Sequence, residues 1–147
     1  MRGVNHTATL AQILRTAKEQ FETGQRFVAQ RDVQAAATAF DAMLFECARA
    51  RRIVRDAPAS VDLRVDRDEF SVVMEDVAKN RNVQEHWQDP INPRKPKTQQ
   101  HTLPNGLTMA VDEVSLIIKG PQEIYKGKLN LYDVYCFLQQ KITQMNK

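Results

Sequence analysis

The stretch LAQILRTAKEQFETGQRFV, residues 10–28, places apolar side chains three or four positions apart over its whole length. This spacing is typical of an amphipathic α-helix, in which such residues share one face. Thr7 and Thr9 are of the residue type that caps a helix N-terminus. We therefore predict a first helix at about residues 8–30.

A second amphipathic stretch follows almost at once, VQAAATAFDAMLFECARARRIV at residues 33–54. Asp32 is a favourable N-cap, and Pro58 disfavours helix in the residue before it. These signals predict a second helix at about residues 33–55. Because the connection between the two helices is very short, we expect them to form an antiparallel hairpin.

A third helix is indicated further along the chain. Residues 61–65 alternate apolar with charged side chains, which predicts a short extended strand. Asp66 can cap a helix at about residues 67–79, whose apolar residues again recur at helical spacing. Asn80 to Asn82 is the expected exit from this helix.

The stretch from residue 84 to residue 100 has a different character. It contains Pro90, Pro93 and Pro96 and almost no apolar side chains. Proline removes a backbone donor and clashes with the preceding helical turn, so we expect no helix here. The composition predicts a linker or extended arm with polyproline II character.

Two short strands and a helix are expected after this arm. Asn105-Gly106 supplies the positive φ angles of a tight turn, which predicts a β-hairpin at residues 101–111. Residues 111–119 fit either a strand or a short helix. Asn130 can cap a final helix at about residues 131–145, where the apolar spacing is regular.

These elements define a mainly α fold class. We expect an N-terminal antiparallel helical hairpin with a third helix, a Pro-rich linker, a small β-hairpin and a C-terminal helix. The corresponding division is a helical hairpin domain at residues 1–83, an extended arm at residues 84–100, and a β-hairpin plus helix at residues 101–147. A chain of this length can bury a real core.

The helical hairpin carries a family resemblance. Four residues fall at the spacing that a tetratricopeptide-type repeat uses for its small and aromatic positions, namely Gly24, Phe27, Ala36 and Phe40. Residues 20–53 thus resemble one such repeat, although Gln20 and Met43 depart from the family pattern. The resemblance implies that Gly24 lets the helices approach closely, that Phe40 packs between them, and that the hairpin is a partner-binding scaffold.

Composition excludes several classes of protein. The hydrophobic fraction is 42% and the charged fraction 27%, and two cysteines are too few for a disulfide scaffold. No apolar run has the length of a membrane-spanning helix. Residues 1–18 lack acids, as transit peptides do, but they continue into the first helix. We therefore expect an intracellular, cytoplasmic protein, with organelle import as the alternative.

The sequence offers no motif for catalysis, a metal or a cofactor, so we expect no enzyme and no bound cofactor. The three histidines are far apart, and no Cys-x-x-Cys spacing occurs. Phosphate-binding loops and nucleophile elbows are also absent. Cys47 lies on an apolar helical stripe and is expected to be a small core residue, whereas Cys136 lies off the stripe of the last helix.

Candidate binding residues gather in two basic clusters and around the arm. In the arm, Trp87 and Ile91 are the large apolar groups, and aromatic anchors are frequent at binding hot spots. The basic residues of the arm are Arg94, Lys95 and Lys97. The second cluster lies near the end of the second helix and comprises Arg49, Arg51, Arg52 and Arg55. Its cations fit either the helix dipole or an acidic partner.

These features favour binding over catalysis. We expect a protein–protein interaction module that serves as a subunit or adaptor of a larger assembly, with the arm ordered on its partner. The alternative is an RNA- or ribonucleoprotein-associated protein that uses both basic clusters. Self-association is a further expectation, in which Phe137 widens the apolar face of the last helix; the alternative is that Phe137 packs against the hairpin at residues 101–119.

Overall fold

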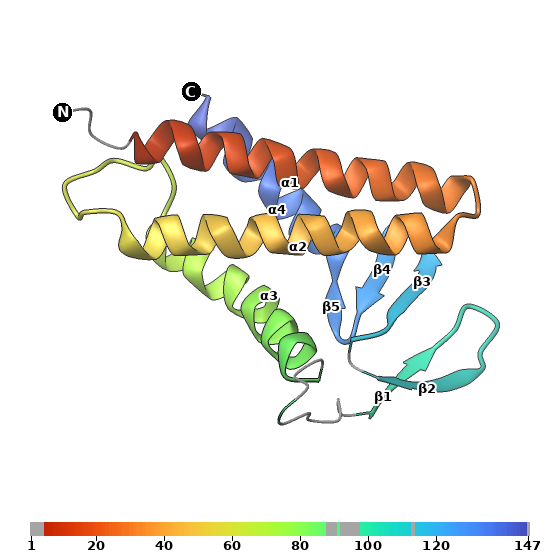
Figure 1. Ribbon diagram of the computed structural model, residues 1–147. Helices are drawn as coiled ribbons and strands as arrows, with labels where there is room; N and C mark the ends of the chain where they lie inside the picture. Colours follow the sequence, from red (N-terminus) through yellow and green to blue (C-terminus); the bar gives the residue numbers. More distant parts are fainter. Residues whose placement is uncertain (1–4, 88–90, 92–97, 113, 147) are drawn as a thin grey trace.

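The computed structural model describes residues 5–87, 91, 98–112 and 114–146. The chain is mainly α, as predicted, with α1 and α2 side by side, α3 crossing below them and α4 behind (Figure 1). The four helices are α1 (His6–Ala29), α2 (Val33–Asp56), α3 (Arg67–Trp87) and α4 (Leu131–Met145). The strands are β1 (Thr98–Thr102), β2 (Thr108–Asp112), β3 (Leu116–Gly120), β4 (Glu123–Lys126) and β5 (Leu129–Asn130).

The predicted helical hairpin is confirmed, with α1 and α2 antiparallel and in contact along their length. The expectation of a threonine cap on α1 is wrong. The side chain of Asn5 accepts a hydrogen bond from the Ala8 backbone N–H at 3.0 Å. Thr7 instead donates its hydroxyl to the Asp62 carbonyl at 2.8 Å, so it ties α1 to the loop before α3. Asp32 caps α2 as predicted.

A close contact between Gly24 and Phe40 sets how near α1 and α2 approach. A Cβ atom added to Gly24 would lie 2.3 Å from Cε1 of Phe40. The Phe40 ring is buried, and its centroid lies 5.4 Å from that of Phe21. The absence of a side chain at residue 24 therefore leaves the space that the aromatic ring occupies, as the sequence pattern predicted.

The loop between α2 and α3 differs from the prediction. Residues 61–65 form no strand, because Arg64 adopts a left-handed backbone conformation with φ of 62°. The backbone N–H of Arg64 donates to the Asp62 side chain at 2.9 Å, which closes a local turn. The alternation of apolar and charged residues here reflects a turn whose Leu63 side chain enters the core.

The Arg67 side chain holds this loop against the end of α2. Its guanidinium donates to the carbonyls of Ala57, Pro58 and Val61, each at 2.8 Å. The planar guanidinium presents several donors in a fixed geometry, so one side chain can satisfy carbonyls from a helix end and a loop together. Asp66 caps α3 as predicted, accepting from the backbone N–H three residues later at 3.0 Å.

The prediction of a non-helical arm at residues 84–100 is wrong at both ends. Helix α3 does not stop near residue 80 but continues to Trp87, and β1 begins at Thr98. Asn80 and Asn82 are weak helix formers but do not stop a helix, and no proline occurs between residues 67 and 89. Residues 84–87 of the predicted arm thus belong to α3 and residues 98–100 to β1, and the rest of the arm apart from Ile91 lies outside the described residues.

The strands form two small antiparallel sheets. In the first, β1 pairs with β2 around the turn at Gly106, whose φ is 86°, so the predicted hairpin is present but one strand begins earlier. The second has the order β3–β4–β5. The ambiguous stretch at residues 111–119 ends in β3, and a turn at Gly127, with φ of 63°, allows β5 to return beside β4.

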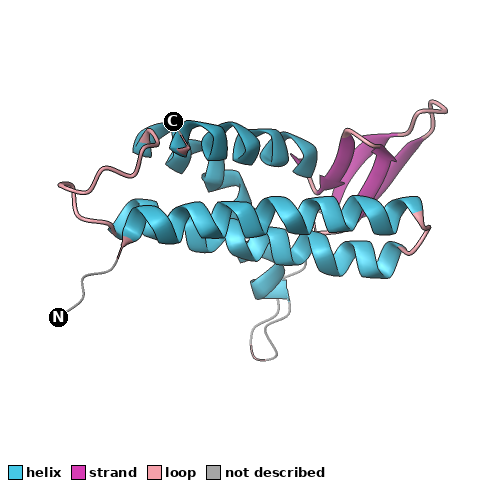
Figure 2. Cartoon of the chain, turned by 90° about the horizontal axis from the view of Figure 1, so that it is seen from above, coloured by secondary structure: helices cyan, strands magenta, loops and turns pink. Residues whose placement is uncertain are grey.

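Helix α4 joins the N-terminal helices in one core. Its bounds agree with the prediction, and Asn130 caps it as predicted, accepting from the Tyr132 backbone N–H at 3.1 Å. Figure 2 shows α4 running beside the α1–α2 hairpin with the strands beyond its N-terminal end. Buried hydrophobic residues from α1, α2, α3, β4 and α4 belong to a single hydrophobic cluster. The predicted N- and C-terminal parts therefore pack together.

Candidate protein-interaction groove

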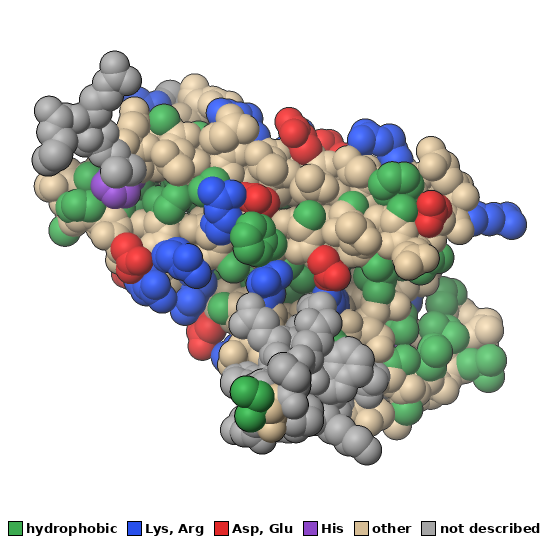
Figure 3. All heavy atoms as spheres, in the orientation of Figure 1, with side chains coloured by type: hydrophobic (Ala, Val, Ile, Leu, Met, Phe, Trp, Pro, Cys, Tyr) green, Lys and Arg blue, Asp and Glu red, His purple; other side chains and the backbone are tan. Residues whose placement is uncertain are grey.

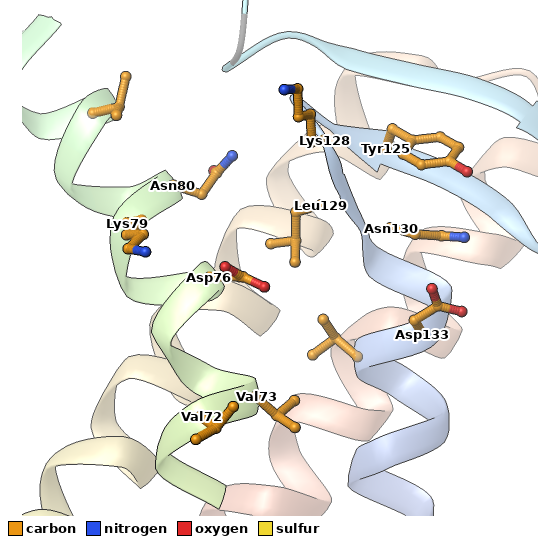
Figure 4. A pocket seen from close by; sticks show the side chains of 12 residues that line it. Val72, Val73, Asp76, Lys79, Asn80, Tyr125, Lys128, Leu129, Asn130 and Asp133 are labelled. Atoms are coloured by element: carbon orange, nitrogen blue, oxygen red, sulfur yellow. The ribbon is translucent and has the colours of Figure 1, made fainter. Parts of the chain in front are cut away.

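An open groove lies between α3 and the opposite wall formed by β4, β5 and the start of α4 (Figure 4). Its volume is about 840 Å³. Residues 72–83 of α3 line one wall, and residues 125–134 line the other. The two walls come from segments that are far apart in the sequence, so the groove exists only because α3 crosses the C-terminal part of the chain.

The groove has an apolar interior that reaches the surface. Val72 is 67% exposed, more than any other large hydrophobic residue whose side chain the structure describes on the four helices. Val73 and Leu129 are half-buried behind it, and Val134 of α4 is buried. Figure 4 shows the side chain of Leu129 extending from β5 into the space between α3 and α4. Such a surface would gain free energy by burying an apolar side chain of a partner.

Hydrogen bonds from two asparagines hold the groove walls in place. The Asn80 side chain on α3 donates to the Lys126 carbonyl at 2.9 Å, which joins the two walls at one end. The Asn130 side chain accepts from the Ile124 backbone N–H at 3.3 Å and donates to the Gln122 carbonyl at 3.1 Å, in addition to capping α4. One amide therefore connects the β3–β4 turn, β4 and α4.

Two buried lysines form ion pairs that join the elements of the groove walls to other helices. Lys126 of β4 is 5% exposed and forms an ion pair with Asp41 of α2. Lys141 of α4 is 1% exposed and forms an ion pair with Glu69 of α3. Buried cations are costly to dehydrate unless they are paired, so each pair ties its two elements together in one arrangement.

The groove carries charges of both signs. Asp76 on α3 and Asp133 on α4 are exposed carboxylates on opposite walls, and in Figure 4 the Asp76 side chain reaches from α3 toward β5. Within the described residues, neither carboxylate forms an ion pair. Lys79 pairs with Glu75 at 3.3 Å, and Lys128 lies at the turn before β5. Two carboxylates are thus available to cationic groups of a partner.

The predicted core cysteine is confirmed, and its environment makes it a poor nucleophile. Cys47 is fully buried on α2, and burial raises the pKa of its thiol to about 12. A thiol with that pKa stays protonated at neutral pH. Cys136 is exposed on α4.

The Arg cluster on α2 is partly neutralised by its own helix. Arg49 pairs with Glu46 at 2.9 Å, and Arg55 pairs with Asp56 at 2.9 Å. The Arg55 guanidinium holds the pKa of the Asp56 carboxyl below its usual range through a hydrogen bond. Arg51 is half-buried, and Arg52 is exposed. Two of the four guanidinium groups therefore have carboxylate partners, while RNA binding by this cluster stays a prediction.

The structure describes the predicted binding residues of the arm only in part. Ile91 is 91% exposed, and Trp87 is the last residue of α3. Arg94, Lys95 and Lys97 lie outside the described residues.

The structure places Phe137 inside the packing of the chain. It lies on α4 with its ring centroid 5.6 Å from that of Phe70 on α3, and the Lys141 ammonium lies 5.0 Å from the ring. The Phe137 ring thus packs against α3, and its part in self-association stays a prediction.

The His, Cys, Asp and Glu side chains described by the structure form no group of three or more that could hold a metal ion. None of the helices in the described ranges combines the length and the apolar character that crossing a bilayer requires. Comparison with known proteins found no matching family model, no matching curated protein and no matching solved structure.

The groove residues were not among the predicted binding residues. In the sequence, Val73 looks like part of the ordinary apolar face of α3, and Asp76 looks like a solvated charge. The sequence contained one signal of the groove. Val72 lies off the apolar helical face that Phe70, Met74 and Val77 share, so its side chain could have been expected to be exposed.

Proposed function

We propose that this protein is a non-enzymatic protein–protein interaction module, a subunit or adaptor of a larger assembly, and that the groove between α3 and the β4–β5–α4 wall is its docking site. The observation that carries the proposal is the exposed apolar interior of this groove, opened by Val72 and Leu129 between two braced walls. Protein-binding surfaces combine such an apolar centre with a polar rim.

The charges on the rim suggest the chemistry of the partner. Asp76 and Asp133 face the groove from opposite walls without ion-pair partners among the described residues. A partner segment with an apolar side chain flanked by Lys or Arg would bury the first against Val72 and place the second near the carboxylates. Such complementary charges govern the specificity and the rate of association more than its strength.

The test is affinity purification of the tagged full chain from its native source, followed by quantitative mass spectrometry. Val72→Glu places a charge at the mouth of the groove, and the matched control Val33→Glu changes a valine of similar exposure at the start of α2, outside the groove. We expect the same partner proteins with the unchanged chain and with V33E, and an at least tenfold lower recovery with V72E, about 1.4 kcal/mol of binding free energy.

The rim carboxylates are tested in the same way with Asp76→Asn and Asp133→Asn combined. We expect reduced recovery at low salt and a smaller difference at high salt, because salt screens exposed charges. Equal recovery of all partners by V72E and V33E would contradict the docking site. Recovery of RNA and RNA-binding proteins that depart with salt would support the alternative function instead.

A further inference from the structure

The β1–β2 hairpin presents its second strand to solvent. His101 of β1 is 6% exposed, with its ring centroid 5.3 Å from that of Tyr125 on β4, so β1 lies toward the rest of the molecule. On β2, Thr108, Met109 and Ala110 are all exposed. Figure 3 shows hydrophobic side chains gathered at the end of the molecule where this hairpin lies. Among the described residues, β2 is therefore the outer strand of a two-stranded sheet.

The hydrogen-bond pattern of the hairpin defines which backbone groups of β2 face outward. The Leu103 backbone N–H donates to the Leu107 carbonyl at 2.7 Å, and His101 lies opposite Met109 in the register. Hydrogen-bonded and non-hydrogen-bonded pairs alternate in an antiparallel ladder, so His101 and Met109 form a hydrogen-bonded pair. The N–H and C=O groups of residues 108, 110 and 112 consequently point away from β1.

We propose that β2 pairs antiparallel with β2 of a second copy of this chain, with Ala110 of one copy opposite Ala110 of the other. In this register residue 108 lies opposite residue 112 of the second copy, so the outward groups of both strands meet. The pairing forms about six backbone hydrogen bonds and joins two hairpins into one four-stranded sheet. The arrangement has twofold symmetry, which is the commonest symmetry of protein dimers.

The same register joins the apolar faces of the two hairpins. Met109, 43% exposed, comes to lie opposite Val111 of the second copy, and Leu107, 64% exposed, extends the same face. Cross-strand pairs of this kind are the unit of sheet stabilisation. A two-stranded hairpin on its own is only marginally stable in water. A sheet of three or more strands with an apolar face can be stable, so pairing would stabilise both hairpins.

Charge also favours a second copy as the occupant of this edge. Residues 98–112 contain no Lys or Arg and one Asp, at residue 112. Natural proteins usually protect exposed edge strands with charges or proline, and β2 has neither at its centre. In the proposed register the two Asp112 positions lie at opposite ends of the strand pair, so like charges do not meet.

The test is sedimentation equilibrium of the full chain from about 1 µM to about 1 mM, a range that measures weak and moderate dimers. Ala110→Pro removes an outward N–H at the centre of the pairing. Its matched control, Gln100→Pro, removes an outward N–H on β1, because residues 100 and 110 form a non-hydrogen-bonded pair. We expect a dimer for the unchanged chain and for Q100P, and an at least tenfold weaker dimer for A110P.

A second measurement keeps the proposal testable if a proline variant does not fold, which circular dichroism would reveal. In the unchanged chain, amide exchange at residues 108 and 110 should slow as protein concentration rises, whereas exchange at residue 100 should not change. A monomer over the whole concentration range would overturn the proposal. So would a dimer that A110P and Q100P weaken equally, or a dimer without concentration-dependent protection of β2.

Discussion

Gly24 is the residue on which the packing of the α1–α2 hairpin most directly depends. Within a helix, Gly→Ala ordinarily gains about 0.5–1 kcal/mol, because glycine loses more backbone entropy on folding. Here the added methyl group would lie 2.3 Å from Cε1 of Phe40. The steric cost of overpacking a core, about 1–3 kcal/mol, exceeds the gain in helix propensity.

We therefore predict that Gly24→Ala lowers the free energy of unfolding by about 1–2 kcal/mol in urea titrations. The control is Gly120→Ala, where an added Cβ has no neighbour within 4 Å, and we expect little change there. Combining Gly24→Ala with Phe40→Leu should cost less than the sum of the two single changes, because the smaller side chain frees the space. An increase in stability for Gly24→Ala would contradict this packing.

Removing either partner of the ion pair between Lys141 and Glu69 should change the stability of the fold by different amounts. Lys141 is 1% exposed, whereas the Glu69 side chain is 50% exposed. Glu69→Gln leaves an ammonium group buried with weaker partners, so we expect a loss of about 1–3 kcal/mol. Lys141→Met removes the buried charge and keeps the volume, so we expect a change within about 1 kcal/mol. Thermal unfolding at neutral pH measures both, and a larger loss for Lys141→Met than for Glu69→Gln would contradict this account of the buried charge.

Asn130 acts on several elements at once. Its amide caps α4, accepts from the Ile124 backbone N–H and donates to the Gln122 carbonyl. We predict that Asn130→Ala costs about 1–2 kcal/mol, at the upper end for a helix cap. Asn130→Asp keeps both accepted bonds and loses the donated one, so it should cost less. Chemical denaturation compares the two, and equal losses would show that the donated bond, and not the two accepted bonds, accounts for the stabilisation.

Among the helices and strands, some bounds can be predicted from sequence patterns and others cannot. Helix α4 was predicted within its observed bounds, because Asn130 supplies a cap and the apolar spacing is regular up to Met145. The end of α3 was predicted too early, since asparagine lowers helix propensity without preventing helix. The strand expected at residues 61–65 is absent because Arg64 adopts a positive φ, which no alternation of apolar residues reveals.

In the whole molecule, helices from both ends of the sequence share one core. Leu138 of α4 is fully buried in the same cluster as Cys47 of α2. The chain should therefore unfold in a single transition, and damage to α4 should expose α2. This packing could not be predicted from sequence, because contacts between α1 and α4 leave no periodic signal of their own.

We predict that Leu138→Ala lowers the free energy of unfolding by about 2–5 kcal/mol. In a Cys136→Ser background, it should also accelerate labelling of Cys47, the remaining thiol. The control Leu107→Ala changes a leucine that is 64% exposed on the β1–β2 hairpin and should alter neither property. Labelling of Cys47 that is unaffected by Leu138→Ala would show that the α1–α2 hairpin is stable without α4.

The candidate groove is likewise a property of the whole molecule. Its walls come from residues 72–83 and 125–134, and no motif in either segment indicates that they meet. The lack of catalytic motifs and the helical hairpin favour the interaction module that we propose, but the sequence directed attention to the arm and the Arg cluster and not to the groove. The apolar opening at Val72 became visible only when α3 was placed against β5.

Site-specific photo-cross-linking in the native source tests the docking groove most directly. A photoreactive amino acid at residue 72 would lie at the mouth of the groove, and the same group at residue 33 would lie on an exposed position outside it. The proposed function predicts a discrete cross-linked protein for residue 72 and none of the same mass for residue 33. Cross-links of equal yield at both positions, or none at residue 72, would contradict a docking site in this groove.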